Sequence, residues 1–108
     1  MQKMSLEAIA REQLEEARRN GGRAANTVFG GHEQVLRQTV IALVTDAELK
    51  EHESPGAATL HVLSGRVRLT AGADSWDGRT GDLIVIPPVR HALSALEDSV
   101  VLLTVAKV

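Results

Sequence analysis

The stretch HVLSGRVRLTAGADSWDGRTGDLIVIPPVRH, residues 61–91, decides the fold of this 108-residue chain. Residues 66–70 alternate charged or polar side chains with apolar ones, which is the period of a strand with one buried face. Residues 83–86 form a short, fully apolar run, and a pair of prolines follows it. Ser64-Gly65 and Gly81-Asp82 are turn signals on either side of these runs. The stretch therefore predicts short strands joined by tight turns.

The same pattern continues through most of the chain. Short runs rich in Val, Ile, Leu and Thr recur at roughly ten-residue spacing, which is typical of an antiparallel sandwich or barrel. These runs cover residues 28–29, 35–44, 58–63, 67–70, 83–86, 91–96 and 100–105. Residues 35–44 are long enough for a helix, but their β-branched content favours a strand. Asp74, Asp77 and Asp82 are interpreted as turn residues between strands. The predicted fold class is all-β.

The N-terminus has a different pattern. Residues 5–20 carry apolar side chains at helical spacing, with Ser5 as a plausible N-cap and Gly21-Gly22 as a stop signal. We therefore expect an N-terminal α-helix and linker over residues 1–22, followed by one β-domain over residues 23–108. The apolar face of this helix comprises Leu6, Ile9, Ala10, Leu14 and Ala17.

Composition excludes several classes of function. The chain has no cysteine, so it has neither disulfides nor thiolate chemistry. Its net charge is −2 and it has one Trp, one Phe and no Tyr, which argues against a nucleic-acid partner. No apolar run approaches the roughly 20 residues that span a bilayer. The first 20 residues are too charged for a signal peptide, so we expect a cytoplasmic protein without a membrane partner.

Two motifs resemble those of the cupin superfamily, a small β-barrel of the jelly-roll type, over residues 33–105. In the first motif, His52 takes the place of the first metal ligand and Gly65 takes the closing place. In the second motif, Gly81 opens an apolar strand that ends at Pro87, and His91 follows. The resemblance implies a cupin-type jelly-roll barrel, and it implies that His52 and His91 converge inside the barrel.

The departures from these motifs bear on the metal. The family's four ligands are three histidines and a glutamate, but Ser54 replaces the second histidine and Ala58 replaces the glutamate. Asp46 stands at the leading glycine of the first motif. Catalytic metal sites usually have three or four protein ligands, and two imidazoles alone make a weak site. The resemblance therefore implies metal ligands at His52 and His91 within an incomplete set, for a divalent Fe, Mn, Ni or Zn ion.

Other polar residues have weaker connections to this site. By alternation along the strand, Leu60 and Val62 share a face with Ala58, and His61 points to the outer face. His32 is expected at the solvated entrance of a strand. Arg90 neighbours His91 at the rim of the pocket, where it either pairs with an anionic ligand or forms a surface salt bridge. The predicted pocket comprises Ser54, Ala58, Leu60, Val62 and Arg90.

Three hypotheses about function follow. The favoured one is a small cupin that binds a small molecule in the barrel lumen without a complete metal site. The second is a metal-dependent cupin enzyme, of the dioxygenase, isomerase or epimerase type, that uses His52 and His91. The third is a regulatory or structural protein whose N-terminal helix docks onto a partner. The sequence does not decide whether the chain is an enzyme. Cupin resemblance and open sheet edges lead us to expect a homodimer.

Overall fold

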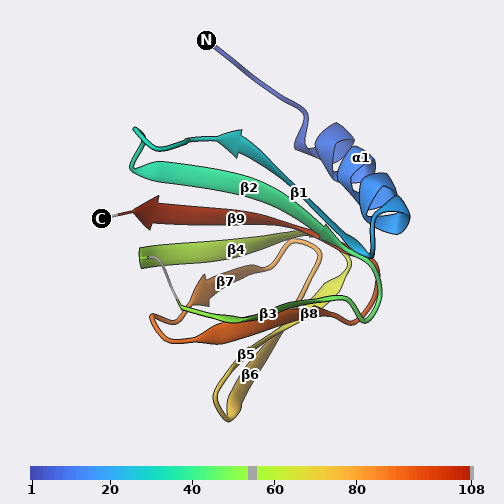
Figure 1. The fold of residues 1–108 in the computed structure, drawn as a ribbon, viewed down its shortest axis with the longest axis vertical. Helices are drawn as coiled ribbons and strands as arrows, with labels where there is room; N and C mark the ends of the chain where they lie inside the picture. The colour runs from blue at the N-terminus through green and yellow to red at the C-terminus, as the bar shows by residue number, and fades with distance from the viewer. Residues whose placement is uncertain (54–55, 108) are drawn as a thin grey trace.

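The structure, a computed structural model, describes residues 1–53 and 56–107. It consists of one helix laid against two antiparallel sheets that face each other (Figure 1). The elements are α1 (Leu6–Arg19), β1 (Arg23–Phe29), β2 (Leu36–Leu43), β3 (Glu48–His52), β4 (Gly56–Ser64), β5 (Arg66–Ala71), β6 (Asp74–Arg79), β7 (Leu83–Ile86), β8 (His91–Ala95) and β9 (Ser99–Lys107).

The strands form two sheets whose order fits a jelly roll. Sheet A has the order β1-β2-β9-β4-β7 and sheet B has the order β3-β8-β5-β6, with antiparallel pairing throughout. No ladder of hydrogen bonds joins the two sheets within the described residues, so side-chain packing closes the barrel. The fold confirms the prediction of an all-β jelly roll with an N-terminal helix.

Two strands were absent from the sequence prediction because their residues are mostly polar. β3 is ELKEH, and β6 is DSWDGR. The interpretation of Asp74 and Asp77 as turn residues is therefore wrong, because both lie in β6. The Asp77 carboxylate accepts a hydrogen bond from Arg68 Nε on β5 at 2.7 Å, and this bond lowers the pKa of Asp77. Asp82 does occupy a turn, where its carboxylate accepts the Arg79 backbone N–H at 2.9 Å.

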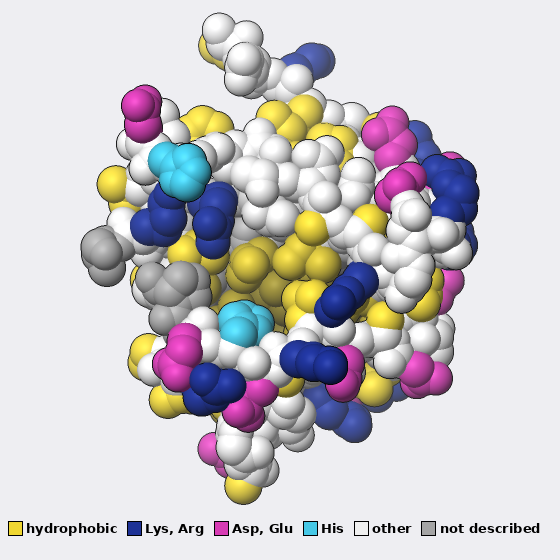
Figure 2. All heavy atoms as spheres, in the orientation of Figure 1, with side chains coloured by type: hydrophobic (Ala, Val, Ile, Leu, Met, Phe, Trp, Pro, Cys, Tyr) yellow, Lys and Arg dark blue, Asp and Glu magenta, His cyan; other side chains and the backbone are white. Residues whose placement is uncertain are grey.

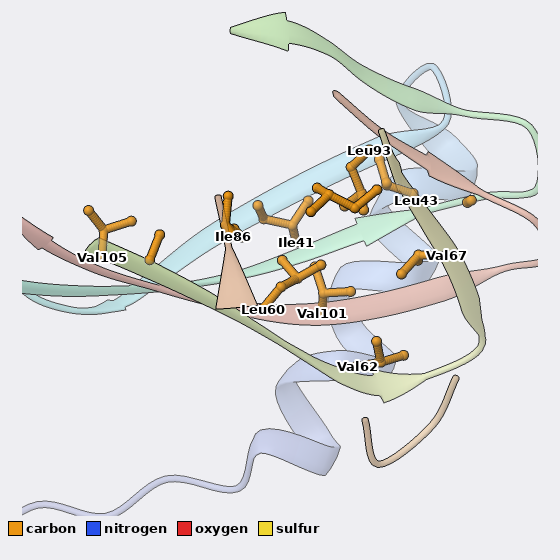
Figure 3. Close-up of a cluster of buried hydrophobic side chains, with 12 residues drawn as sticks. Ile41, Leu43, Leu60, Val62, Val67, Ile86, Leu93, Val101 and Val105 are labelled. Carbon is orange, nitrogen blue, oxygen red and sulfur yellow. The ribbon is translucent and has the colours of Figure 1, made fainter. Parts of the chain in front are cut away.

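The core lies between the two sheets (Figure 3). Alternation in β5 is as predicted, with Val67 and Leu69 buried and Arg66 and Arg68 exposed. Opposite them, strands β2, β4 and β9 of sheet A turn every second residue inward. The inward side chains of this cluster that Figure 3 labels are Ile41, Leu43, Leu60, Val62, Val67, Ile86, Leu93, Val101 and Val105.

The chain passes from sheet A to sheet B at Gly65, at one end of the barrel. The Gly65 N–H donates to Thr80 Oγ1 at 3.0 Å, and the Thr80 N–H donates to the Gly65 carbonyl at 3.1 Å. The buried Ser99 hydroxyl accepts the Arg66 N–H at 2.9 Å and lies 2.7 Å from the Glu97 carbonyl. This closed end therefore joins the connections β4–β5, β6–β7 and β8–β9 through polar contacts.

Helix α1 covers the outer face of sheet A over β1, β2 and β9. Ser5 caps the helix as predicted, because its Oγ accepts the Ala8 N–H at 3.1 Å. The predicted apolar face packs on Val40, Ala42 and Val100, and Ala17 is fully buried. No helix in residues 1–53 or 56–107 is long and apolar enough to cross a bilayer.

Asp98 ties the helix and the β2–β3 connection to the start of β9. Its carboxylate accepts the Thr45 backbone N–H at 2.8 Å and the Thr45 hydroxyl at 3.0 Å, and it pairs with Arg18 at 2.9 Å. The pKa of Asp98 is lowered first by the Thr45 N–H and then by Arg18. Because the folded pKa lies below the unfolded one, ionised Asp98 stabilises the fold above the unfolded pKa, and this stabilisation is lost as pH falls.

We expect Asp98→Ala to lower the free energy of unfolding at neutral pH by about 0.5–1.5 kcal/mol, because the Thr45 N–H exchanges a charged acceptor for water. Asp98→Asn keeps an acceptor and is expected to lose less. Urea unfolding at neutral pH and below about pH 4, near the unfolded pKa of Asp, checks both variants. The deficit of Asp98→Asn should shrink in acid, and an equal deficit at both pH values would contradict the role of the charge.

Candidate functional site

Six strand ends gather at the barrel end opposite Gly65, which we call the mouth. Backbone pairing connects the start of β2 to the end of β9, the end of β9 to the start of β4, and the start of β4 to the end of β7. Residues 87–90 then lead to the start of β8, which pairs with the end of β3. Figure 2 shows a hollow between the sheets with a hydrophobic floor, a histidine at its edge, and Lys or Arg side chains on two sides.

His52 and His91 lie side by side at the mouth. They are register partners across β3 and β8, and their ring centroids are 4.5 Å apart in an edge-on arrangement of 63°. Leu49 and His52 are three residues apart, so a regular strand would turn them to opposite faces. The register shift between them allows both side chains to point to the inner face. His91 is only 4% exposed, whereas His52 is exposed. The two histidines that the sequence motifs brought together are therefore adjacent in the structure.

The same hydrogen bond orients each ring. His52 Nδ1 lies 2.9 Å from the Lys50 carbonyl, and His91 Nδ1 lies 2.8 Å from the Val89 carbonyl. A carbonyl can only accept, so each Nδ1 carries the proton and donates it. Each Nε2 is then the nitrogen left for a metal or a ligand, as is usual for orienting contacts behind metal-binding histidines.

The inner face of β4 is apolar. Ala58, Leu60 and Val62 are buried on the inner face of β4. Ala58 pairs directly with Ile86 on one side and with Val105 on the other. Ser54 lies outside the described residues.

Within residues 1–53 and 56–107, the site lacks the full ligand set of a divalent metal. Ala58 brings a methyl group to the position where the family has a carboxylate, so His52 and His91 have no third donor from β4. No group of three His, Asp, Glu or Cys side chains that could hold a metal occurs in residues 1–53 and 56–107. Two imidazoles fall short of the three protein ligands of catalytic sites. We therefore assign no step of chemistry to a metal.

Arg90 forms salt bridges at the rim. Its Nε donates to Glu51 at 3.0 Å and its Nη1 donates to Glu53 at 3.1 Å. The bond to Glu51, and then the bond to Glu53, raise the pKa of Arg90. An anionic ligand would have to displace two carboxylates from this guanidinium. The structure thus matches the salt-bridge alternative for Arg90, and Glu53 is turned to Arg90.

The other two histidines lie away from the pair. His61 pairs with Leu83 and Leu102, and it alternates with the inward residues of β4, so it faces the outer side of sheet A. His32 is exposed in the connection between β1 and β2. Both positions agree with the sequence prediction.

The sequence analysis missed two cations on the lumen side of the mouth. Arg37 pairs with Val105 across β2 and β9, and Lys107 lies two residues beyond Val105 on the same face. All other Lys and Arg side chains are exposed, whereas Arg37 and Lys107 are partly buried. Alternation along β2 could have located Arg37, because Arg37, Thr39 and Ile41 point to the same face of the strand. Ile41 lies in the core, so this face is the inner one.

Comparisons with known proteins agree with this fold. The family model described as Cupin domain matches residues 39–106, and the chain belongs to that family. No curated protein matches the sequence significantly.

Three solved structures illustrate the similarity. A conserved protein of unknown function from Streptococcus pyogenes has a TM-score of 0.74 at 32% identity, covering 82% of this chain and 77% of that one. A cupin superfamily protein from Desulfitobacterium hafniense has a TM-score of 0.72 at 14% identity, with coverages of 80% and 78%. The salicylate 1,2-dioxygenase of Pseudoaminobacter salicylatoxidans, with gentisate, has a TM-score of 0.80 at 19% identity. That match covers 95% of this chain but only 32% of the dioxygenase, so it concerns the fold alone.

Proposed function

We propose that this cupin binds a small molecule in the barrel lumen, at the mouth, without a complete metal site. One observation carries the proposal: two oriented imidazoles lie side by side at the mouth, where Figure 2 shows an apolar hollow, and they have no third metal donor among the described residues. An apolar cavity with a few convergent polar groups is the usual form of a small-molecule site.

Methyl NMR of the full chain tests the proposal. We expect neutral aromatic fragments, such as phenol and benzyl alcohol, to shift the methyl signals of Leu60 and Val105, which line the lumen. Val85 serves as the internal control, because it is 74% exposed on the outer face of sheet A. Shifts at Val85 alone, or at no methyl group, would contradict binding in the lumen.

The metal-dependent enzyme remains the second candidate because both Nε2 atoms are available. Stoichiometric Fe, Mn, Ni or Zn that is lost from His91→Ala would favour it. The third candidate, a partner-binding helix, has less support, because the apolar face of α1 already packs on sheet A.

We also propose a homodimer. The edge strand β7 presents Leu83 and Val85, which are 61% and 74% exposed, and self-association would cover them.

A further inference from the structure

The charge distribution of sheet A is one-sided. Its five strands contain no acidic residue, whereas sheet B contains four, in β3 and β6. The lysine and arginine residues of sheet A are Arg23, Arg37 and Lys107. Residues paired across neighbouring strands point to the same face of a sheet. Arg23 pairs with the core residue Leu43, and Arg37 pairs with the core residue Val105. Lys107 lies two residues after Val105 on β9, so all three occupy inward positions. The lumen side of sheet A is therefore cationic.

Arg37 is the cation among these three that is free to bind a ligand. Arg23 Nη1 donates to the Glu48 carbonyl at 3.3 Å, and Lys107 Nζ donates to the Gly31 carbonyl. The Arg37 side chain forms no hydrogen bond or ion pair within the described part of the chain, although it is partly buried. A guanidinium without a protein partner keeps all of its N–H donors available, and an anionic ligand can accept them in charge-assisted hydrogen bonds.

Arg37 is aligned with the position of the missing carboxylate. Backbone pairing places Arg37, Val105, Ala58 and Ile86 in one row across sheet A. Strands are spaced by about 4.8 Å, so the Cα atoms of Arg37 and Ala58 are roughly 10 Å apart, and an extended arginine covers much of this distance. Where the family has a carboxylate that holds a metal cation, this chain has a methyl group and, two strands away, an unpaired cation.

The geometry points to an anionic ligand class: the lumen binds a small apolar molecule that bears a carboxylate, and Arg37 pairs with that carboxylate directly. This inference rests on the proposed function and names its ligand chemistry. The ring or chain of the ligand lies on the floor formed by Ala58 and Leu60. The guanidinium forms two parallel hydrogen bonds to the carboxylate oxygens. In this proposal the Arg37 side chain supplies the positive charge that binds the anion, in place of a metal ion.

Benzoate and benzamide are matched probes, because they share shape and differ in charge at neutral pH. Titration of the full chain, followed through the methyl signals of Leu60 and Val105, gives both affinities. We expect benzoate to bind at least about tenfold more tightly than benzamide, as charge-assisted hydrogen bonds contribute more than neutral ones. In Arg37→Gln the two affinities should agree within about twofold, and Arg37→Lys should keep part of the preference.

Arg79→Gln is the matched control, because Arg79 is an exposed arginine at the closed end of the barrel, on β6. It should keep the full preference for benzoate. Equal affinities for the two probes in the parent, or a preference that survives in Arg37→Gln, would overturn the anionic class and leave lumen binding intact. The absence of methyl shifts with either probe would overturn the proposed function as well.

Discussion

Replacing Gly65 with alanine is expected to lower the free energy of unfolding by about 3 kcal/mol or more, a large share of the 5–15 kcal/mol that is typical of a domain. Gly65 has a φ of +92°, where a β-carbon is strained. An added Cβ would lie 2.3 Å from Ser99 Oγ and 2.4 Å from the Asp98 carbonyl oxygen. The second contact involves backbone, so rotation of a side chain cannot relieve it.

Gly72→Ala separates crowding from backbone strain. Gly72 also has a positive φ, of +61°, but no heavy atom lies within 4 Å of its added Cβ. We expect this variant to lose only about 1 kcal/mol, the cost of the left-handed conformation. Urea unfolding of both variants measures the difference. Similar losses would show that the contacts of Gly65 with Ser99 and Asp98 are unimportant.

Ala58→Glu is expected to convert the pair of histidines into a metal site. The introduced carboxylate would complete a set of two imidazoles and one carboxylate, the ligand set of non-haem iron sites. We expect Zn²⁺ or Fe²⁺ affinity to rise at least about 100-fold, equivalent to about 2.7 kcal/mol. Isothermal titration and elemental analysis after desalting compare the variant with the parent, which should retain little metal.

Two further variants check this result. Ala58→Glu with His91→Ala should lose the gain, because one imidazole is removed. Ala58→Glu with Arg37→Gln should bind metal more tightly than Ala58→Glu alone, because Arg37 lies in the same row and competes for the new carboxylate. If Ala58→Glu binds no more metal than the parent, the inner face of β4 does not serve the two histidines.

The sequence predicts the apolar part of the fold well. Strands β2, β5, β7 and β9 carry alternating or continuous apolar runs, so hydrophobic periodicity finds them. β3 and β6 escape it, because exposed charged side chains on these edge strands supply no such period. Their place depends on pairing with β8 and β5, which only the assembled sheet provides.

The sequence likewise predicts one part of the candidate site and not another. The motif places His52 and His91 together, and alternation along β4 places Ala58, Leu60 and Val62 on the inner face. The orientation of the two imidazoles was not predicted, because it depends on hydrogen bonds to the Lys50 and Val89 carbonyls, whose directions are set by the folded backbone. The importance of Arg37 also required the register of β2 on β9, a long-range pairing that local sequence does not encode.

The position of β9 constrains how the domain is made. β9 lies between β2 and β4 in sheet A, and its Val100 and Leu102 complete the packing under α1. During synthesis the helix emerges before the nine strands, and although β1 and β2 also pack on it, β9 completes that packing and is the last strand to emerge. Contacts of such long sequence separation close slowly. The nascent domain therefore keeps its apolar surfaces uncovered until Lys107 is free, and a chain cut before Ser99 would have no route to the native barrel.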